Sequence, residues 1–536
     1  MRHQRAGIRA AGIAGIASVA LGAGIGEFCA GLVAAQSGPF TVIGGWIIDL
    51  APPGAKDLMV ALFGTGDKAA LLIAIGIVAA LAAAGAGVWE SRRRHAGAVT
   101  ALALGLLIGA LALTRSDAGA LSWAPSVVSG VVAALALGPI VRRAVPDGSA
   151  SPDGSASPDG TAVADCEPDG APDPGPAPHA TRRTFLVFAG SAAAVGALAA
   201  VGGVLLRAGT VAATAVREAI SLPRPATPAA PIPAGAELAV EGLTPLITPN
   251  RDFYRIDTAL TVPNVDPGTW ELRVHGMVEQ EIVLTWDELL ALPLVESAVT
   301  LSCVSNEVGG DLVGNAVWLG APIRDLLARA RPLPDADMAL SRSVDGFTAS
   351  TPLEALTDDR DALLAVGMNG EPLPQQHGFP VRMVVPGLYG YVSATKWVVD
   401  IEITRFDRAR AYWTDRGWSE RGPIKLQSRV DVPRSGASVQ AGETVIAGVA
   451  WQPHAGISAV EVRIDDLPWQ RAELAPAIST DTWVQWRLPW RATAGSHGIS
   501  CRAISATGEV QTARRALPAP DGATGLHTID VTVVAG

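Results

Sequence analysis

One cysteine stands where an apolar segment gives way to a polar turn. In the stretch TLSCVSNEVGG, residues 300–310, Cys303 follows a run of apolar residues and precedes Ser, Asn, Glu and paired Gly. A thiolate suits a metal held by sulfur, and at a strand end a ligand can reach it. Taken alone, an isolated cysteine is better explained as a small buried apolar side chain.

The remaining cysteines form no metal-binding pattern with Cys303. Together with Cys29, Cys166 and Cys501 it makes no CxxC pair and no cluster with histidine, so a zinc site is not expected. There is also no CxxCH haem-attachment sequence and no iron–sulfur pattern. If the C-terminal half is exported, the count leaves room for one disulfide, Cys303–Cys501.

The segments around Cys303 predict an α+β domain over residues 236–424. TWELRVHGMV (269–278), FPVRMVVPG (379–387) and TKWVVDIEITRF (395–406) have the composition of strands. TWDELLALP (285–293) predicts a short helix in which Thr285 is the N-cap and Glu288 completes a capping box. VWLGAPIRDLLARA (317–330) predicts a strand end followed by an amphipathic helix.

Residues 425–536 have a different pattern. Short alternating segments such as ETVIAGVAWQ, GISAVEVRID and GLHTIDVTVVAG are separated by Gly and Pro, which is typical of a two-sheet sandwich. Its histidines are scattered, so we assign no chemistry to this part.

The N-terminal part predicts a membrane region. Hydrophobic residues make up 49% of the chain, and mean hydropathy is +0.30. Apolar runs at 8–35, 69–89, 97–114 and 124–141 predict a four-span region within residues 1–145, and 184–206 predicts a fifth span. Arginines flank the ends that face the cytoplasm, which places the chain after residue 206 outside the cytoplasmic membrane. The net charge of −10 argues against a nucleic-acid partner.

Two linkers separate these parts. Residues 146–183 form a Pro/Asp/Gly/Ser-rich segment expected to be a disordered cytoplasmic linker, and residues 207–235 form a Pro-rich tether. TRRTFLVFAG (181–190) begins the fifth span with a sequence that resembles a twin-arginine export signal. The alternative is a pair of arginines that anchors the helix at the cytoplasmic face.

Five segments occur along the chain in this order: DFYRID (252–257), LSCVSN (301–306), WLGAPIRDLL (318–327), HGFPVRMVVPG (377–387) and ATKWV (394–398). Together they resemble the sulfite oxidase family of molybdopterin enzymes, and they are most similar to membrane-anchored actinobacterial members that lack haem. The resemblance covers nearly all of residues 240–536. It implies a molybdopterin-binding oxidoreductase domain over 236–424 and an immunoglobulin-like, dimerisation-type domain over 425–536.

The resemblance implies roles for residues on both sides of the cysteine. In that family a single cysteine thiolate ligates molybdenum beside the two sulfurs of the pterin dithiolene, which gives this role to Cys303. Phe253, Arg255 and Asp257 fall where the family has F-x-R-x-H, a segment that lines the pterin and substrate pocket and here includes Tyr254. Arg255 is thus a candidate catalytic residue.

The two later motifs imply the phosphate side of the cofactor site. His377 and Arg382 match the H-G-x-P-x-R motif that holds the pterin phosphate, a task suited to the paired donors of a guanidinium. Lys396, with the backbone of Ala394 and Thr395, matches the S-x-K segment that closes over the pterin. Without the family resemblance, these basic residues would be explained equally well as solvated charges at the edge of a sheet.

Two departures from the family concern the substrate. Trp418 stands at the position of the family's tyrosine near the metal, and Asp257 replaces a histidine. In the sandwich only His454 is near the place of a basic residue, although Arg255 and Arg416 could bind an anion. Because Asp257 would add negative charge and Trp418 an apolar face, we expect weak oxidation of sulfite and better activity on a neutral sulfoxide or N-oxide.

The sequence therefore predicts a molybdenum–molybdopterin oxidoreductase that performs two-electron oxygen-atom transfer on a small sulfur or nitrogen oxo-substrate. It is expected in the cytoplasmic membrane as a multi-pass protein, with its catalytic domain on the extracytoplasmic side. Expected partners are the lipid bilayer, a quinone or cytochrome that exchanges electrons, and a second copy of the chain. The alternative is a membrane-anchored binding protein that keeps the fold and has lost the cofactor.

Overall fold

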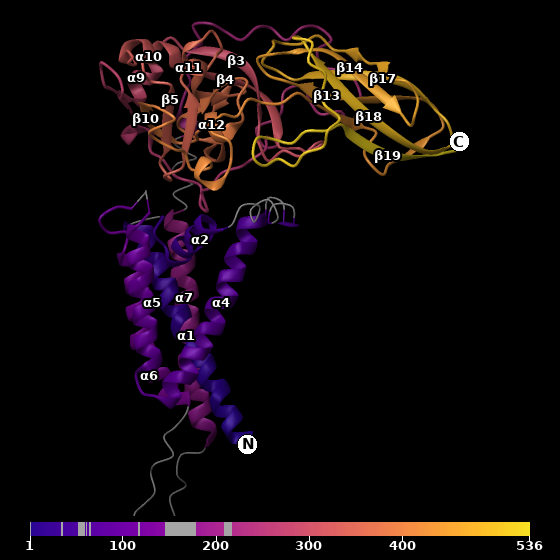
Figure 1. Ribbon diagram of the computed structural model, residues 1–536. Coiled ribbons are helices and arrows are strands. Elements are labelled where there is room, and N and C mark those ends of the chain that lie inside the picture. Colours follow the sequence, from indigo (N-terminus) through magenta and orange to yellow (C-terminus); the bar gives the residue numbers. More distant parts are fainter. Residues whose placement is uncertain are drawn as a thin grey trace, which may run out of the picture. The chain divides into compact units, whose positions relative to one another are not determined.

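The computed structural model of the chain separates into two compact units (Figure 1). The first comprises Met1–Ala51 and Leu58–Gly209, and the second Pro52–Asp57 and Thr210–Gly536. The structure describes residues 2–33, 36–51, 59, 62–63, 66–115, 118–144, 178–207 and 217–535. Most of the predicted linker 146–183, with Cys166, lies outside these residues. So do residues 208–216 of the predicted tether.

The described part of the first unit is helical. Its helices are α1 (Arg2–Val33), α2 (Pro39–Leu50), α4 (Asp67–Arg92), α5 (Ala96–Leu113), α6 (Ala124–Ala144) and α7 (Pro178–Arg207). All except the shorter α2 contain a stretch long and apolar enough to cross a membrane. The five predicted spans coincide with these five helices to within a few residues, because a long apolar run satisfies its backbone hydrogen bonds as a helix. Residues 178–183, assigned above to the linker, belong to α7, whose first turn begins with a proline.

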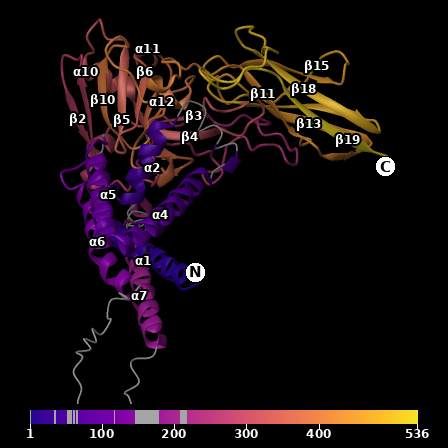
Figure 2. The same ribbon diagram turned by 60° about the horizontal axis from the view of Figure 1, so that its bottom comes forward.

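Figure 2 shows α1 among the other helices of the first unit, and glycines allow it to approach two of them closely. A Cβ atom added to Gly24 would collide with the backbone of Gly196 on α7, and one added to Gly15 would collide with the backbone of Ala83 on α4. Small residues at helix crossings allow backbones to approach and gain van der Waals contact where solvent-driven burial is weak. Gly15 and Gly24 are therefore packing residues, whereas Gly76, Gly85 and Gly190 have open space where a Cβ atom would lie.

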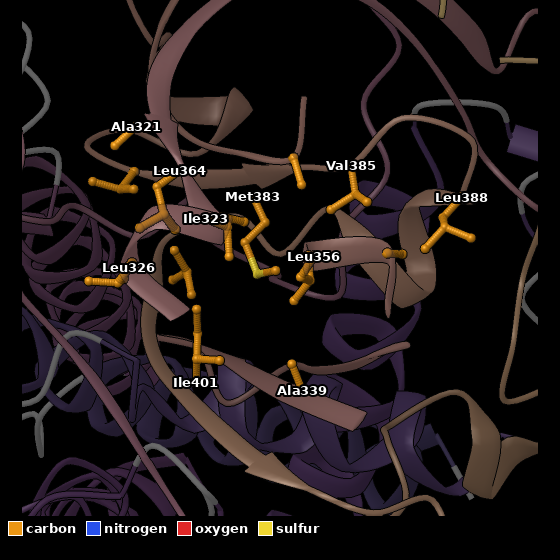
Figure 3. Close-up of a cluster of buried hydrophobic side chains, with 14 of the residues drawn as sticks. Ala321, Ile323, Leu326, Ala339, Leu356, Leu364, Met383, Val385, Leu388 and Ile401 are labelled. Atoms are coloured by element: carbon orange, nitrogen blue, oxygen red, sulfur yellow. The ribbon is translucent and has the colours of Figure 1, made fainter. Parts of the chain in front are cut away.

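The second unit begins with two five-stranded sheets that share a core. One has the order β2-β1-β10-β5-β6; in the other, β3, β4, β7 and β8 are neighbours and β9 pairs with β7. The strands are β1 (Glu271–Gly276), β2 (Ile282–Thr285), β3 (Val295–Ser302), β4 (Val313–Pro322), β5 (Met338–Ser343), β6 (Thr348–Pro352), β7 (Leu363–Met368), β8 (Glu371–Pro372), β9 (Arg382–Val384) and β10 (Val398–Thr404). In Figure 3, Ala339 and Ile401 from the first sheet lie in one apolar cluster with Leu364 and Met383 from the second.

Short helices complete this α+β part. They are α9 (Trp286–Leu290), α10 (Ile323–Ala330), α11 (Glu354–Thr357) and α12 (Gly390–Ser393). The capping box of α9 is confirmed, because the Thr285 side chain accepts from the backbone N–H of Glu288 while the Glu288 carboxylate accepts from that of Thr285. The predicted helix after β4 is confirmed as α10.

The C-terminal part is two β-sheets around a second core. One sheet has the order β11-β13-β17-β16 and the other β12-β19-β18-β14-β15. Apolar side chains from both sheets, among them Ile446, Trp486, Val462 and Ile529, form this core. The strands are β11 (Gln427–Val432), β12 (Ser438–Gln440), β13 (Gly442–Trp451), β14 (Ile457–Ile464), β15 (Gln470–Arg471), β16 (Glu473–Leu474), β17 (Val484–Ala492), β18 (Gly495–Ser505) and β19 (His527–Val534). The alternation in the sequence thus predicted the strands and the two layers.

Candidate active site

Cys303 is the first residue after strand β3, as the sequence predicts. Its side chain is only 8% exposed, and its backbone N–H donates to the carbonyl of Leu312 at 2.9 Å. Residues 303–312, which we call the cysteine loop, connect β3 to the antiparallel strand β4. Asn306 closes the loop from inside, because its side-chain oxygen accepts from Leu312 N at 2.9 Å. The thiol therefore has a defined place at a strand end.

No disulfide joins Cys303 to Cys501. Cys501 is fully buried in the core of the C-terminal sheets, where the Ser428 hydroxyl donates to its sulfur at 3.3 Å. Burial raises the pKa of the Cys501 thiol to about 12, so this cysteine stays protonated. It is a core side chain and does not belong to the site.

Phe253 and Tyr254 lie close to the cysteine. The Phe253 ring stacks on Tyr254 with centroids 5.2 Å apart and meets the rings of Trp318 and His377 edge-on, each at 5.7 Å. A Cβ atom on Gly314 of β4 would lie 2.7 Å from the Phe253 ring, so a glycine is required beneath it. Burial raises the pKa of Tyr254 far above its ordinary value, and the charge of Cys303 acts in the same direction. The tyrosine thus shares one environment with the thiol.

Arg382, on β9, is a buried cation whose hydrogen bonds within the described residues go to carbonyl groups. Its guanidinium donates to the carbonyls of His377 at 3.2 Å, Met383 at 3.3 Å and Ala394 at 3.4 Å. Within the described part of the chain it pairs with no carboxylate, although it is only 6% exposed. Burial lowers the pKa of Arg382 to about 10, which still leaves it charged at neutral pH. A buried positive charge held in this way favours an anionic ligand.

His377 is buried near Arg382, and its role as a phosphate donor stays a prediction. Burial and the charge of Arg382 lower the pKa of His377 to about 4, so the ring is neutral at pH 7. Its Nε2 lies 3.0 Å from the carbonyl of Asn250 and donates to it. The neutral ring then has only an acceptor, Nδ1, for other contacts. His377 therefore organises the pocket by binding Asn250.

Asp257 forms an ion-pair group with Lys396 and Arg255. Its Oδ2 lies 2.7 Å from Lys396 Nζ and 2.9 Å from Arg255 Nε, and its side chain is only 4% exposed. Lys396 also donates to the carbonyl of Gln376 at 3.1 Å. Burial lowers the pKa of Lys396 to about 8, while Asp257 opposes that change, so Lys396 loses its proton as the pH rises through about 8.

This pairing corrects the expected effect of Asp257. The sequence treats it as an unneutralised charge that repels an anion, but two cations contact the same carboxylate oxygen. The charge of Asp257 is therefore neutralised by its partners and gives no argument against an anionic substrate.

The segment Ala394-Thr395-Lys396 runs beside β9. A bridge pairs Arg382 with Lys396, and Met383 N donates to Thr395 O at 2.9 Å. Gly378 makes this approach possible, because its φ is +112° and a Cβ atom there would lie 2.9 Å from Arg382 Cβ and 3.2 Å from Lys396 Cβ. The two basic motifs predicted from the sequence are thus brought together.

Three further residues that the sequence suggested for the site, Trp418, Arg416 and His454, contact other side chains. Trp418 lies against Tyr391 at 6.0 Å and Trp413 at 6.3 Å between ring centroids. Arg416 stacks on the Tyr412 ring at 3.6 Å. His454 Nδ1 lies 3.4 Å from a carboxylate oxygen of Asp481. The expected place of Trp418 beside the thiol stays a prediction.

Sequence reasoning missed Tyr389. Burial raises its pKa to about 12, with a contribution from Cys303, and its hydroxyl accepts from Lys425 N at 3.3 Å. It precedes α12, where a Cβ atom on Gly390 would lie 3.9 Å from both Ser302 O and Tyr254 Oη. The signal was the Gly/Tyr turn LYGY between two matched motifs.

The part of the chain that contains Cys303 and Arg382 is similar to known proteins. Residues 259–413 match the model of the oxidoreductase molybdopterin binding domain. The uncharacterized oxidoreductase YuiH of Bacillus subtilis is 33% identical over 157 residues, which cover 29% of this chain and 76% of that protein. The chain belongs to the sulfite oxidase-like family of molybdopterin oxidoreductases. This confirms the predicted family and the molybdenum–molybdopterin cofactor.

The chain matches only part of the length of other relatives. Mitochondrial sulfite oxidases of Mus musculus and Homo sapiens are each 32% identical, over 324 and 322 residues, covering 51% of this chain and 58% of theirs. The chain thus spans 58% of the length of these relatives. The crystal structure of the sulfane dehydrogenase SoxCD from Paracoccus pantotrophus matches with a TM-score of 0.47 and 24% identity, covering 54% of this chain and 81% of that one.

Proposed function

We propose that this chain is a membrane-anchored oxidoreductase that performs two-electron oxygen-atom transfer on a small sulfur or nitrogen oxo-substrate outside the cytoplasmic membrane. The observation that carries the proposal is a buried thiol at a strand end and a buried Arg382 that both act on the pKa of Tyr254, in a domain whose family binds molybdopterin. Metal and pterin contents of the purified chain test it. A folded chain that holds neither would favour the non-catalytic binding protein.

The residues present fit a phosphate-bearing cofactor. Arg382, buried and without a carboxylate partner in the described residues, would hold the phosphate, and Lys396 with the backbone of Ala394 and Thr395 would close over the pterin. Cys303 would provide the thiolate that ligates molybdenum. When bound, the cofactor supplies the two-electron chemistry, while the protein positions it and the substrate.

Phe253, Tyr254 and Arg255 would form the substrate side of the pocket. The two rings stack, and the Arg255 side chain, 34% exposed, is the most accessible cation of the charged group. Asp257 holds Arg255 in place through an ion pair of 2.9 Å. We therefore propose an anionic sulfur oxo-substrate such as sulfite, in place of the neutral substrate expected from the sequence.

Steady-state assays on sulfite and on a neutral sulfoxide check this substrate class. The wild type is expected to have the higher kcat/KM for sulfite, and Arg255→Met to lower it by about tenfold to a hundredfold, because an ionic contact with the anion is lost. Activity on the sulfoxide should change little. Arg251→Met is the matched control, since its side chain is 85% exposed and pairs with Asp252. A higher kcat/KM of the wild type for the sulfoxide than for sulfite would contradict the anionic substrate and support the neutral one expected from the sequence.

The membrane topology is part of the same proposal. Five apolar helices, with arginines at residues 92–94 and 142–143, support a cytoplasmic N-terminus and an external catalytic part. Reporters fused after residues 150 and 236 are expected to be active inside and outside the cytoplasm, respectively. A reporter at 236 that is active only inside would refute this topology. If the twin-arginine route is used, replacing Arg182 and Arg183 by lysine should retain the catalytic part inside.

Electrons would pass to or from a membrane quinone or a separate cytochrome, because the chain contains no haem-attachment or iron–sulfur pattern. The C-terminal sheets would form an immunoglobulin-like domain and provide the surface for a homodimer, as the resemblance implies. Sedimentation of the purified chain in detergent tests the dimer, and reoxidation kinetics with a quinone or a cytochrome test the electron partner.

A further inference from the structure

The cysteine loop is closed on itself but is also contacted from outside. Within it, Asn306 N donates to Cys303 O at 3.1 Å and Gly310 N to Glu307 O at 2.9 Å. These bonds leave the carbonyl of Gly310 and the backbone of Gly309 directed toward other parts of the second unit. Both are contacted by the C-terminal sheets.

Arg429, on β11, binds the loop directly. Its Nη1 donates to the carbonyl of Gly310 at 2.7 Å, its Nε to Asp431 at 2.6 Å and its Nη2 to the hydroxyl of Thr244 at 2.9 Å. The Arg429 and Asp431 side chains are only 10% and 8% exposed. Because three hydrogen bonds fix the orientation of this buried, planar guanidinium, Arg429 on β11 fixes the position of the Gly310 carbonyl.

His527, the first residue of β19, supports the adjacent loop residue. Gly309 has φ +82°, and its Cα lies so close to the His527 ring that an added Cβ would overlap it. His527 Nδ1 accepts from Val430 N at 3.0 Å, which fixes the ring beside Arg429. Burial and the charge of Arg429 lower the pKa of His527, so it stays neutral and keeps this acceptor.

The strand that leads to Cys303 is held in the same way. Thr300 N donates to the carbonyl of Asp481 at 2.9 Å, and the Thr300 hydroxyl accepts from Trp483 N at 2.8 Å. Both partners belong to the segment before β17. The C-terminal sheets therefore contact the chain before and after the thiol.

We propose that the C-terminal sheets position Cys303, with Arg429 and His527 as positioning residues that act through the cysteine loop. The consequence for cofactor binding rests on the proposed function, in which Cys303 ligates molybdenum. The mechanical claim, that these contacts hold the loop closed over a buried thiol, stands independently of it. It gives the C-terminal part a role in the site besides that of a dimerisation surface.

The test is the rate at which iodoacetamide alkylates Cys303 in the full chain purified without cofactor, followed by mass spectrometry of its peptide. Arg429→Met and His527→Asn are expected to raise this rate, the former by about tenfold, as a charge-assisted bond no longer opposes local opening. Asparagine retains an acceptor for Val430 N but loses the ring contact with Gly309. Arg487 on β17 forms an exposed ion pair with Glu473 on β16, and Arg487→Met should leave the alkylation rate unchanged.

Cys501 provides an internal control because it is fully buried in the same C-terminal core. Its alkylation must stay slow for a variant to count as folded. If Arg429→Met exposes Cys501, the alkylation rate of Cys303 in His527→Asn decides whether the proposal holds. An unchanged Cys303 rate in a folded variant overturns the proposal.

Molybdenum content of the same variants, produced with cofactor, separates the two claims. A fall in content together with faster alkylation supports both positioning and metal ligation by Cys303. Faster alkylation with full molybdenum content supports the positioning and shows that the other contacts of the cofactor retain the metal when the cysteine loop is loosened.

Discussion

Replacing Cys303 by serine is expected to abolish turnover while leaving the catalytic part folded. Serine has nearly the same volume, and its hydroxyl does not ionise to provide a metal ligand at neutral pH. We expect kcat to fall by about a thousandfold or more, as for removal of a group that acts at the reacting centre. Molybdenum and pterin contents, measured in the same preparation, normalise the activity per cofactor.

Cys501→Ser is the matched control. Cys501 has a hydroxyl neighbour, Ser428, and no part in the proposed site, so activity per cofactor should be retained even where stability falls. Activity of metal-loaded Cys303→Ser within a few fold of the wild type would contradict the ligand assignment.

Replacing Arg382 by methionine is expected to deplete the purified chain of pterin. Loss of paired, charge-assisted bonds to the phosphate should weaken cofactor binding by about a hundredfold, which corresponds to about 3 kcal/mol. Fluorescence of the released pterin measures the content.

The stability of the cofactor-free chain makes this prediction specific. Arg382 is a buried charge without a carboxylate partner in the described residues, so its removal relieves a desolvation cost while it deprives three carbonyls of their donor. We expect the free energy of unfolding to change by only about 1–2 kcal/mol. Arg405→Met, which removes an exposed pair with Asp407 in the same part, should affect neither quantity. Full pterin content in folded Arg382→Met would refute the phosphate role.

Local features of the chain were predictable from the sequence. The five apolar helices, the capping box at Thr285 and the alternating strands depend on periodicity and hydrogen bonding within one segment. The position of Cys303 after a buried strand has the same origin. Because the family motifs occur in order, the sequence also predicts that the basic residues belong to one cofactor site.

The tertiary structure decided which groups neutralise one another. Asp257 and Lys396 are 139 residues apart, and no local pattern predicts that this carboxylate binds two cations. Likewise, the bond from His377 to Asn250 and the contacts of Trp418 depend on how distant loops pack. Arg429 reaches Gly310 across 119 residues because two sheets and a strand end meet there. Motifs specify residue types, whereas charge balance and the support of a reactive thiol depend on partners that only folding brings within hydrogen-bond distance.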